Sequence, residues 1–506
     1  MLRLSRENLM ASISSSKTLV DFIEHSFKRF PHKTALIVDN QRFDYQTIKS
    51  ITDNISSQLI KITKKSQIVA LLLPNSPEFI FAYFSILKAN CVVLLLPANI
   101  SDQSLIYQIE KTNTKIIITN NIYQEKIKRA GLVNKLEMLT MDYLLSRTVK
   151  LIKRPPTARN ISTIIFTSGT TSLPKGVILL HKNVVNATKN ICQFLKLRHS
   201  DIDINISSLS HSFGLGHIHC LFAVGGTVVL FRDAINLKKI LLAIHDYKAT
   251  TFGAVPAVLR LLINNYPQQL KKYLKNLRFI QTNTSPLEKN LITTITTLLP
   301  HCDFNYYYGL SEASRSTFIT LNKHKSKWQS SGQPSPHVKV KIADPHTQRT
   351  LPAGKIGEIC IKGKHVIQTY WKNPKATRTI KNGWLYTGDV GYMDKEHFLY
   401  FKGRKDDVIN VAGEKVMPEE IEEVTKQYPA IQDCAAIGVP DRLLGEKVKL
   451  YIQLKNSKAI QNEALLRFLR LKLESYKLPR AIETIEKIPR TDNGKLMRNK
   501  LKNAYG

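Results

Sequence analysis

Two wholly apolar segments on either side of one short helix constrain the fold of this chain more than any other feature. Residues 68–73 and 91–97 are continuous apolar runs, which predict buried strands. Between them Ser76, Pro77 and Glu78 begin a helix, since Ser caps an N-terminus, Pro fits the first turn and Glu favours its positive end. Two buried strands joined by a helix predict a parallel sheet covered on both faces.

The same alternation returns later and then changes. Residues 227–231 and 250–255 are strand-like and flank a helical pattern at 236–248, whereas residues 336–402 hold short strands between Gly and Pro turns. A compact, more helical tail follows Gly403. The sequence therefore predicts an α/β protein. Residues 1–402 form a large domain of doubly wound subdomains plus a small β-rich subdomain, and residues 403–506 form a small α+β domain.

The charge of the chain narrows the choice of partners. Its 506 residues carry a formal net charge of +35, which would attract an acidic carrier protein, an anionic membrane surface or nucleic acid. Lys, Asn and Ile are frequent throughout, as an AT-rich genome would produce, and the charge is spread along the chain. We therefore favour compositional bias, and not a charged partner, as the cause of the positive charge. Without zinc-finger spacing or an aromatic-basic block, we expect no nucleic-acid partner.

The cysteines and the apolar runs bear on location. The six cysteines are far apart in sequence, form no C-x-x-C pair and mostly sit in apolar stretches, which predicts reduced core thiols. The longest apolar candidate, 68–97, is interrupted by polar residues, so we expect no transmembrane segment. The N-terminus lacks an apolar signal region. These features together predict a cytoplasmic protein.

Residues 167–176 (TSGTTSLPKG) carry the strongest chemical signal. They follow the apolar run 161–166 and combine small, hydroxyl and basic side chains: Thr167, Ser168, Gly169, Thr170, Thr171, Lys175 and Gly176. Glycine lets the backbone approach a ligand, hydroxyls donate hydrogen bonds to phosphate oxygens, and lysine supplies charge. The order differs from the G-x-x-x-x-G-K-[ST] loop. The segment predicts a phosphate cradle, and the alternative is a polar turn.

Four further blocks follow in order: Tyr308-Gly309-Leu310-Ser311-Glu312, Tyr386-Thr387-Gly388-Asp389, residues 403–407 (GRKDD) and residues 493–498 (NGKLMR). With residues 167–176 they resemble the adenylate-forming (AMP-binding) superfamily, from about Thr18 to the C-terminus. That superfamily includes acyl-CoA synthetases, aryl-CoA ligases, peptide-synthetase adenylation domains and beetle luciferases.

The resemblance implies a role for each block. The 167–176 loop would orient the phosphates of ATP, and Tyr308, Gly309 and Ser311 would lie against the nucleotide. Glu312 would hold Mg²⁺, Asp389 would accept the ribose hydroxyls, and Arg404 would contact ribose or phosphate. Lys495 would bridge the substrate carboxylate and the α-phosphate from a mobile C-terminal domain, with Asp406 as the hinge.

The resemblance also bears on the acid and the acceptor. His211, Phe213 and Gly214 match the acyl-pocket segment, with His211 also a candidate catalytic residue or an ordinary core histidine. No Asp or Glu lies between Leu209 and Phe231, so a buried α-ammonium would be unpaired and an uncharged acyl or aryl acid is favoured.

Gly413 lies in a block similar to that of acyl-CoA synthetases, where it would let the pantetheine arm of CoA pass. The expected function is ATP-dependent activation of a fatty or aryl acid, followed by thioester formation with CoA. The main alternative transfers the acyl group to an acidic acyl carrier protein. A nucleotide-binding protein without catalysis is a further alternative, against which the intact Glu312, Asp389 and Lys495 argue.

Overall fold

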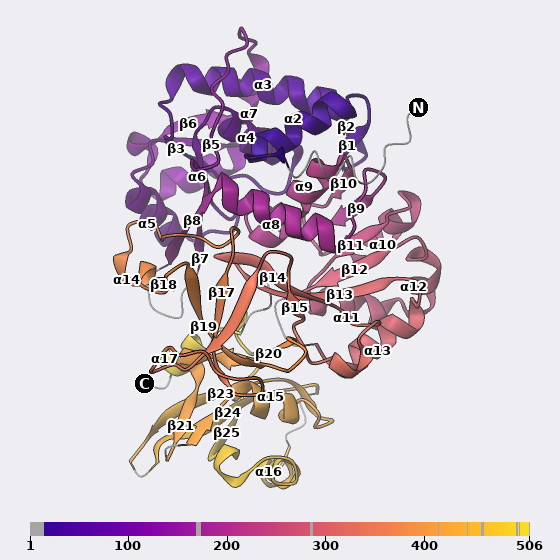
Figure 1. Cartoon of the computed structure of the whole chain (residues 1–506), viewed down its shortest axis with the longest axis vertical. Helices are drawn as coiled ribbons and strands as arrows, with labels where there is room; N and C mark the ends of the chain where they lie inside the picture. The colour runs from indigo at the N-terminus through magenta and orange to yellow at the C-terminus, as the bar shows by residue number, and fades with distance from the viewer. Residues whose placement is uncertain are drawn as a thin grey trace.

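The computed structural model of the chain describes residues 15–167, 174–283, 287–412, 414–442, 444–456, 460–491, 494 and 496–504. Within these residues four β-sheets organise the fold (Figure 1). The helices are α2 (Leu19–Arg29), α3 (Tyr45–Ile62), α4 (Pro77–Lys88), α5 (Asp102–Thr112), α6 (Asn121–Arg129), α7 (Met141–Ser146), α8 (His181–Phe194), α9 (Ser212–Val224), α10 (Leu237–Asp246), α11 (Pro256–Asn265), α12 (Pro267–Tyr273), α13 (Lys289–Leu298), α14 (Pro374–Thr377), α15 (Pro418–Thr425), α16 (Asn462–Arg470) and α17 (Arg498–Asn503).

The six-stranded sheet contains the unit that the sequence predicts most clearly. Its order is β6 (Glu137–Thr140), β5 (Ile116–Thr119), β3 (Ile68–Leu71), β4 (Val92–Leu95), β7 (Ile161–Thr167) and β8 (Lys175–Leu180). β3 and β4 are parallel, and the connecting α4 has the Ser76 side chain as its N-cap and Pro77 in its first turn. Only β8 is antiparallel, so residues 167–175 connect two neighbouring strands of a hairpin.

The nine-stranded sheet combines distant parts of the chain. Its order is β15 (Gln333–Pro334), β14 (Ala313–Thr320), β13 (Asp303–Leu310), β12 (Phe279–Thr282), β11 (Thr251–Gly253), β9 (Ile202–Asn205), β10 (Thr227–Leu230), β1 (Thr34–Val38) and β2 (Gln41–Asp44). The strands from β13 to β1 are parallel. The doubly wound α/β architecture is therefore confirmed.

One apolar core joins the two large sheets. It contains residues of β3 and β4 from one sheet and of β1, β10, β13 and β14 from the other, with α4, α8 and α9 between them. Figure 1 shows α8 crossing the molecule between the two sheets. α4 is buried around almost its whole circumference, as expected for a helix enclosed in a core.

The third sheet is the predicted β-rich subdomain, with β16 (Lys339–Ala343), β17 (Gly357–Lys362), β19 (Trp384–Met393) and β18 (Ile380–Lys381) in order, and β20 (Leu399–Arg404) beside β19. The predicted domain boundary at 402/403 falls inside β20, because Gly403 and Arg404 still pair with Val390 and Asp389. The short helical turn η3 (Lys405–Asp407) follows.

The C-terminal tail is built on a sheet rather than mainly on helices. The strands are β22 (Glu414–Val416), β21 (Ile409–Val411), β24 (Gly445–Leu454) and β23 (Ile431–Asp441), with β25 (Ala481–Thr484) beside β24. β23 and β24 form a long antiparallel pair whose buried Ala, Ile and Val face α15 and α16. The local sequence pattern predicts a more helical tail than this, because the register of the sheet is set by pairing between strands and not by local pattern.

Candidate active site

A buried charged cluster lies where β13, β19 and β20 meet. The Tyr308 hydroxyl donates to Asp389 Oδ2 at 2.6 Å, and Arg404 Nη1 donates to Asp389 Oδ1 at 2.5 Å. Asp389 is 3% exposed. Burial opposes the charge on Arg404, but the Asp389 carboxylate outweighs burial and raises the pKa of the guanidinium. Three residues that the sequence placed in separate blocks are thus in direct contact.

Glu312 lies in the turn between β13 and β14, close to this cluster. Its carboxylate accepts a hydrogen bond from the Tyr370 hydroxyl at 3.0 Å. Burial raises the pKa of Glu312, and the Asp389 carboxylate adds to that effect, while Tyr370 and Arg404 lower it. A carboxylate in such surroundings gains from a cation, so Glu312 suits a Mg²⁺ ion held by one carboxylate and by phosphate oxygens. No cluster of three or more metal-ligating side chains occurs among the described residues.

The base of the 167–176 loop lies against the same region. Thr167 and Lys175 are paired where β7 and β8 meet the loop, and Gly176 O accepts from the Trp371 backbone N–H at 2.7 Å. A Cβ on Gly176 would lie 2.9 Å from the Trp371 Cβ, so only glycine permits this approach. Because Tyr370 precedes Trp371, the loop base and Glu312 are brought together. Tyr370 was missed from the sequence, since only the fold shows that it contacts Glu312.

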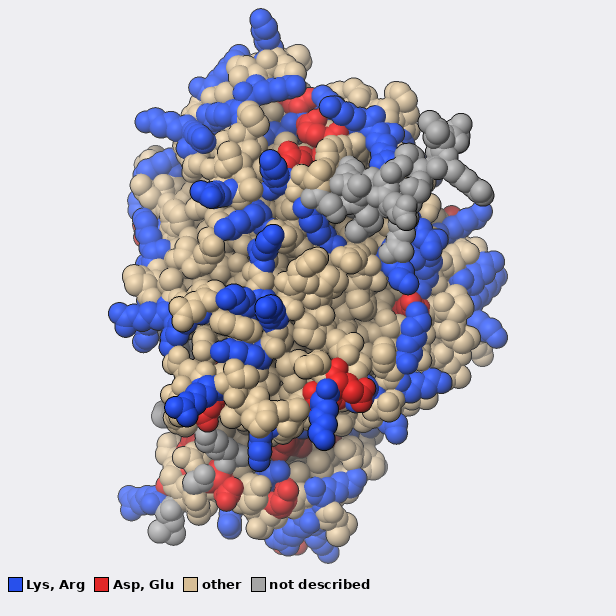
Figure 2. Space-filling model, in the orientation of Figure 1, with Lys and Arg blue, Asp and Glu red and all other residues tan. Residues whose placement is uncertain are grey.

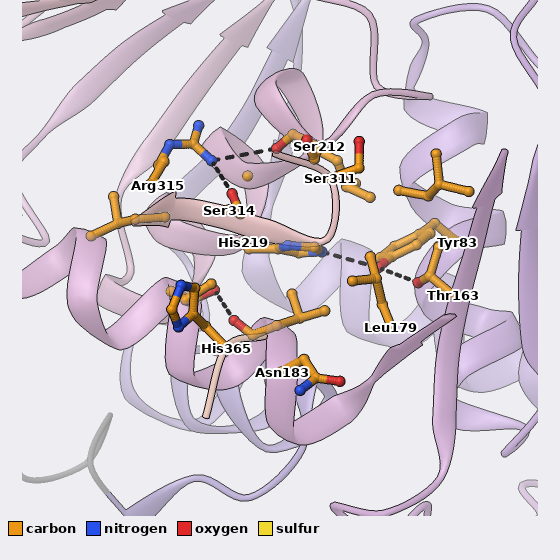
Figure 3. Close-up of a pocket in the computed structure, with 17 residues that line it drawn as sticks. Tyr83, Thr163, Leu179, Asn183, Ser212, His219, Ser311, Ser314, Arg315 and His365 are labelled. Atoms are coloured by element: carbon orange, nitrogen blue, oxygen red, sulfur yellow. Dashed lines mark hydrogen bonds between the residues drawn. The ribbon is translucent and has the colours of Figure 1, made fainter. Parts of the chain in front are cut away.

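A pocket opens beside Glu312 between α8, α9 and β14 (Figure 3). It encloses about 500 Å³ between its atoms, a volume that includes open solvent at its mouth. Apolar side chains of α8 and β8 form one wall. Polar residues line much of the rest, and they are Tyr83, Thr163, Asn183, Thr188, Ser212, His219, Ser311, Ser314, Arg315 and His365.

The residues predicted for the acyl pocket lie at the start of α9, and this pocket is lined by their neighbours on the same helix. Ser212, Leu215 and Gly216 line the pocket, whereas His211, Phe213 and Gly214 do not. Positions i, i+3 and i+4 share one helix face, which explains the difference. His211 is the N-cap residue of α9, and Phe213 packs its ring edge-on against His217. Gly214 lies on the backbone of Ser208, where a Cβ would be 2.3 Å from the carbonyl oxygen.

The structure describes some of the remaining predicted site residues but not others. Gly309 lies in β13, Ser311 follows it at the pocket, and Asp406 lies in η3 after β20. The other predicted residues lie outside the part of the chain that the structure describes, and they are Ser168, Gly169, Thr170, Thr171, Gly413 and Lys495.

Two family models match this chain. The model described as "AMP-binding enzyme" matches residues 23–371, and that described as "AMP-binding enzyme C-terminal domain" matches residues 420–495.

Among curated proteins, the chain is 26% identical over 484 residues to 4-coumarate–CoA ligase 1 of Petroselinum crispum, with 91% of this chain and 89% of the relative covered. It is 27% identical to a long-chain-fatty-acid–CoA ligase of Bacillus subtilis (strain 168), with 96% and 94% covered.

Solved structures share the fold. An o-succinylbenzoate CoA synthetase of Bacillus subtilis, in complex with its acyl-adenylate intermediate, has a TM-score of 0.86 at 24% identity, covering 95% of this chain and 97% of that one. The ATP-bound MatB of Rhodopseudomonas palustris has a TM-score of 0.87 at 22% identity, covering 96% and 99%.

Proposed function

Because this chain belongs to the AMP-binding enzyme family, we propose that it is an AMP-forming acid–thiol ligase that activates a carboxylic acid with ATP and transfers the acyl group to CoA. The observation that carries the proposal is the buried Asp389–Arg404 pair with the Glu312 carboxylate close to it, since Tyr370 contacts Glu312 and the next residue, Trp371, contacts the base of the 167–176 loop. The similar proteins named as CoA ligases support the choice of acceptor.

The reaction has two steps. A substrate carboxylate oxygen attacks the α-phosphorus of ATP, and the bond from that phosphorus to the bridging oxygen breaks, so pyrophosphate leaves with the electron pair. The sulfur of CoA then attacks the acyl carbon, the bond to the AMP oxygen breaks, and the thiol proton passes to solvent.

The residues of the chain would bind and orient the reactants. Asp389 has oxygens that accept from ribose hydroxyls, and Arg404 would retain its charge beside the phosphates. Mg²⁺ at Glu312 would neutralise the approach of two anions. Lys495 would add positive charge between the carboxylate and the α-phosphate, where negative charge accumulates.

The first experiment measures pyrophosphate release over a panel of fatty and aryl acids, with and without CoA. Acid-dependent release and a CoA thioester product are expected. Absence of release with every acid would contradict the proposal.

The Lys495→Ala variant separates the two steps. We expect it to abolish adenylate formation and to spare thioester formation from supplied acyl-adenylate. The matched control is Lys487→Ala, since Lys487 is an exposed lysine of the same tail. Equal loss in both steps would give Lys495 a structural role. Gly413→Leu should instead slow only the thiol step, and a rigid hinge at Asp406 (Asp406→Pro) should do the same.

The acceptor is tested by competition. Lys and Arg are spread over the whole face shown in Figure 2, and this positive surface would also attract an acidic acyl carrier protein. CoA and a carrier with the same pantetheine arm are offered together to the preformed acyl-adenylate. CoA should be preferred, and a carrier preference above about tenfold would favour the alternative function.

The protein is proposed to act in the cytoplasm. All six cysteines are buried and unpaired, which suits a reducing compartment. In the described part of the chain, no helix is long and apolar enough to cross a membrane.

A further inference from the structure

Arg315 lies in β14 in a conformation that non-glycine residues rarely adopt. The φ angle of Arg315 is +52°, in the left-handed region, and only 2% of the residue is exposed. The β13–β14 pairing shifts register between Tyr308 and Leu310, and a Cβ on Gly309 would lie 2.3 Å from Arg315 N. The surrounding backbone therefore holds Arg315 in place. Backbone conformations of this kind persist where the neighbouring structure enforces them, often at functional sites.

The guanidinium of Arg315 is buried without an anionic partner. Nη1 donates to Ser212 O at 3.4 Å and to Ser314 Oγ at 3.3 Å, and Nη2 donates to Phe213 O at 3.2 Å. Nε has no hydrogen-bond partner within the part of the chain that the structure describes. Among the described residues no carboxylate lies close enough to form an ion pair with it. A buried charge without a counterion is costly, so this arrangement favours an incoming anion.

Two further contacts define the surroundings of this cation. Its guanidinium carbon lies 5.4 Å from the Phe213 ring centre and 5.0 Å from that of Tyr307, so aromatic faces supply part of the stabilisation. The backbone carbonyls that it contacts belong to the first turn of α9, which is the positive end of a helix. A cation is disfavoured at that end and an anion is favoured there.

The pocket wall next to Arg315 consists mainly of hydrogen-bond donors. Ser212, Ser311 and Ser314 line it together with Arg315, and none of the described residues that line the pocket is acidic. His219 lines the same pocket, and burial lowers its pKa to about 3, so it is neutral at ordinary pH. Figure 3 shows Arg315, Ser314, Ser212 and Ser311 along one side, with His219 below them. Such a wall complements a group that carries acceptors and negative charge.

We propose that the acid substrate carries a second carboxylate, which Arg315 binds with the Ser212 and Ser314 hydroxyls while the first carboxylate is activated beside Ser311 and Glu312. This inference rests on the proposed function and narrows its substrate to dicarboxylic acids. It differs from the uncharged acyl chain predicted from the sequence, because that prediction rests only on the absence of Asp and Glu between Leu209 and Phe231.

The test compares acids in pairs that differ only at the far end. Glutarate is paired with pentanoate, adipate with hexanoate, and isophthalate with 3-methylbenzoate, so that a carboxylate replaces a methyl group in each pair. The rate of pyrophosphate release gives kcat/KM for each acid. We expect the wild-type protein to prefer the diacid of at least one pair by more than about tenfold.

Variants at Arg315 assign that preference to this side chain. Arg315→Met should lower kcat/KM for the preferred diacid by about 100-fold, chiefly through KM, and should lower kcat/KM for the paired monoacid by at least about tenfold less. Arg315→Lys keeps the charge without the planar fork and should recover part of the diacid activity. The matched control is Arg232→Met, which removes the same charge from a side chain that is 59% exposed.

The outcomes separate the two proposals. No pyrophosphate release with any acid would overturn the proposed function, whereas release that favours the monoacids would overturn only the inference about Arg315. An equal loss for both acids of a pair in Arg315→Met would make Arg315 structural. Thermal melting checks that each variant is folded. If Arg315→Met does not fold, the wild-type selectivity and Arg315→Lys decide the question, as does a rise in the wild-type melting temperature with diacid but not with monoacid.

Discussion

The buried histidines predict that this protein loses stability in mild acid. His219 in α9 is 6% exposed, and its Nε2 lies 3.1 Å from the Tyr83 hydroxyl. Burial, aided by the nearby charge of Arg315, lowers the pKa of His219 from 6.5 to about 3. The folded protein therefore keeps this imidazole neutral, whereas the unfolded chain protonates it below pH 6.5. Because the unfolded state binds more protons, the free energy of unfolding falls as the pH falls.

The magnitude follows from these two pKa values. Between pH 7 and pH 5, protonation of His219 in the unfolded chain alone lowers the free energy of unfolding by about 2 kcal/mol. Burial also lowers the pKa of His181 and of His365 to about 4, and each adds a loss of about 2 kcal/mol over the same interval. The sum approaches the whole free energy of unfolding of an ordinary protein, so we expect marked acid lability.

The assay is urea unfolding followed by circular dichroism at pH 7 and at pH 5, at constant ionic strength. In His219→Gln, whose amide nitrogen replaces Nε2, the fall in the free energy of unfolding should be smaller than in the wild type by about 2 kcal/mol. The control is His245→Gln, because the His245 side chain is 34% exposed. If His219→Gln and the wild type lose the same free energy between the two pH values, the reasoning is refuted.

Three further predictions concern other parts of the molecule. Asp389→Asn removes the charge beside Arg404 and should raise KM for ATP about tenfold in initial-rate measurements; an unchanged KM would contradict the nucleotide role. Gly214→Ala places a Cβ 2.3 Å from the Ser208 carbonyl oxygen, and its urea midpoint should fall by an amount corresponding to about 1–3 kcal/mol. Burial raises the pKa of Glu419 to about 8, so the folded state holds a proton that it must release as the pH rises. Stability should fall between pH 7 and pH 9, and the fall should be smaller in Glu419→Gln; identical urea midpoints across this range would refute that expectation.

The parts of the fold that the sequence predicts best are those set by local pattern. The strand beginning at Ile68 and the helix beginning at Pro77 lie where the sequence predicts them, because apolar runs and N-cap chemistry act over a few residues. The helix expected at 236–248 is likewise observed as α10, capped by Asn236. The C-terminal sheet was underestimated, since β23 and β24 stabilise each other only once they are paired.

In the candidate site, too, the sequence predicts individual residues but not the contacts between them. Motif order predicts site roles for Tyr308, Asp389 and Arg404, but their mutual contact depends on the register of three strands. The Tyr370 contact to Glu312 joins residues 58 positions apart and has no local signal. Arg315 had a weak signal, a charged residue within the strand-like run after Glu312. Its lack of an acidic partner could be read only from the packed structure.

The strand order also has a consequence for synthesis on the ribosome. β1 pairs in parallel with β10. The β1–β2 edge of the nine-stranded sheet therefore cannot form until Val228, the partner of Leu36, has been synthesised. At a translation rate of roughly 5–20 residues per second, the intervening chain takes roughly 10–40 seconds to emerge. During this interval β1 and β2 form at most an isolated hairpin, while the strands of the six-stranded sheet emerge and can assemble first. The unpaired strand edge of this N-terminal hairpin is therefore the part of the nascent chain that is most exposed to aggregation, and a chaperone would be most useful there.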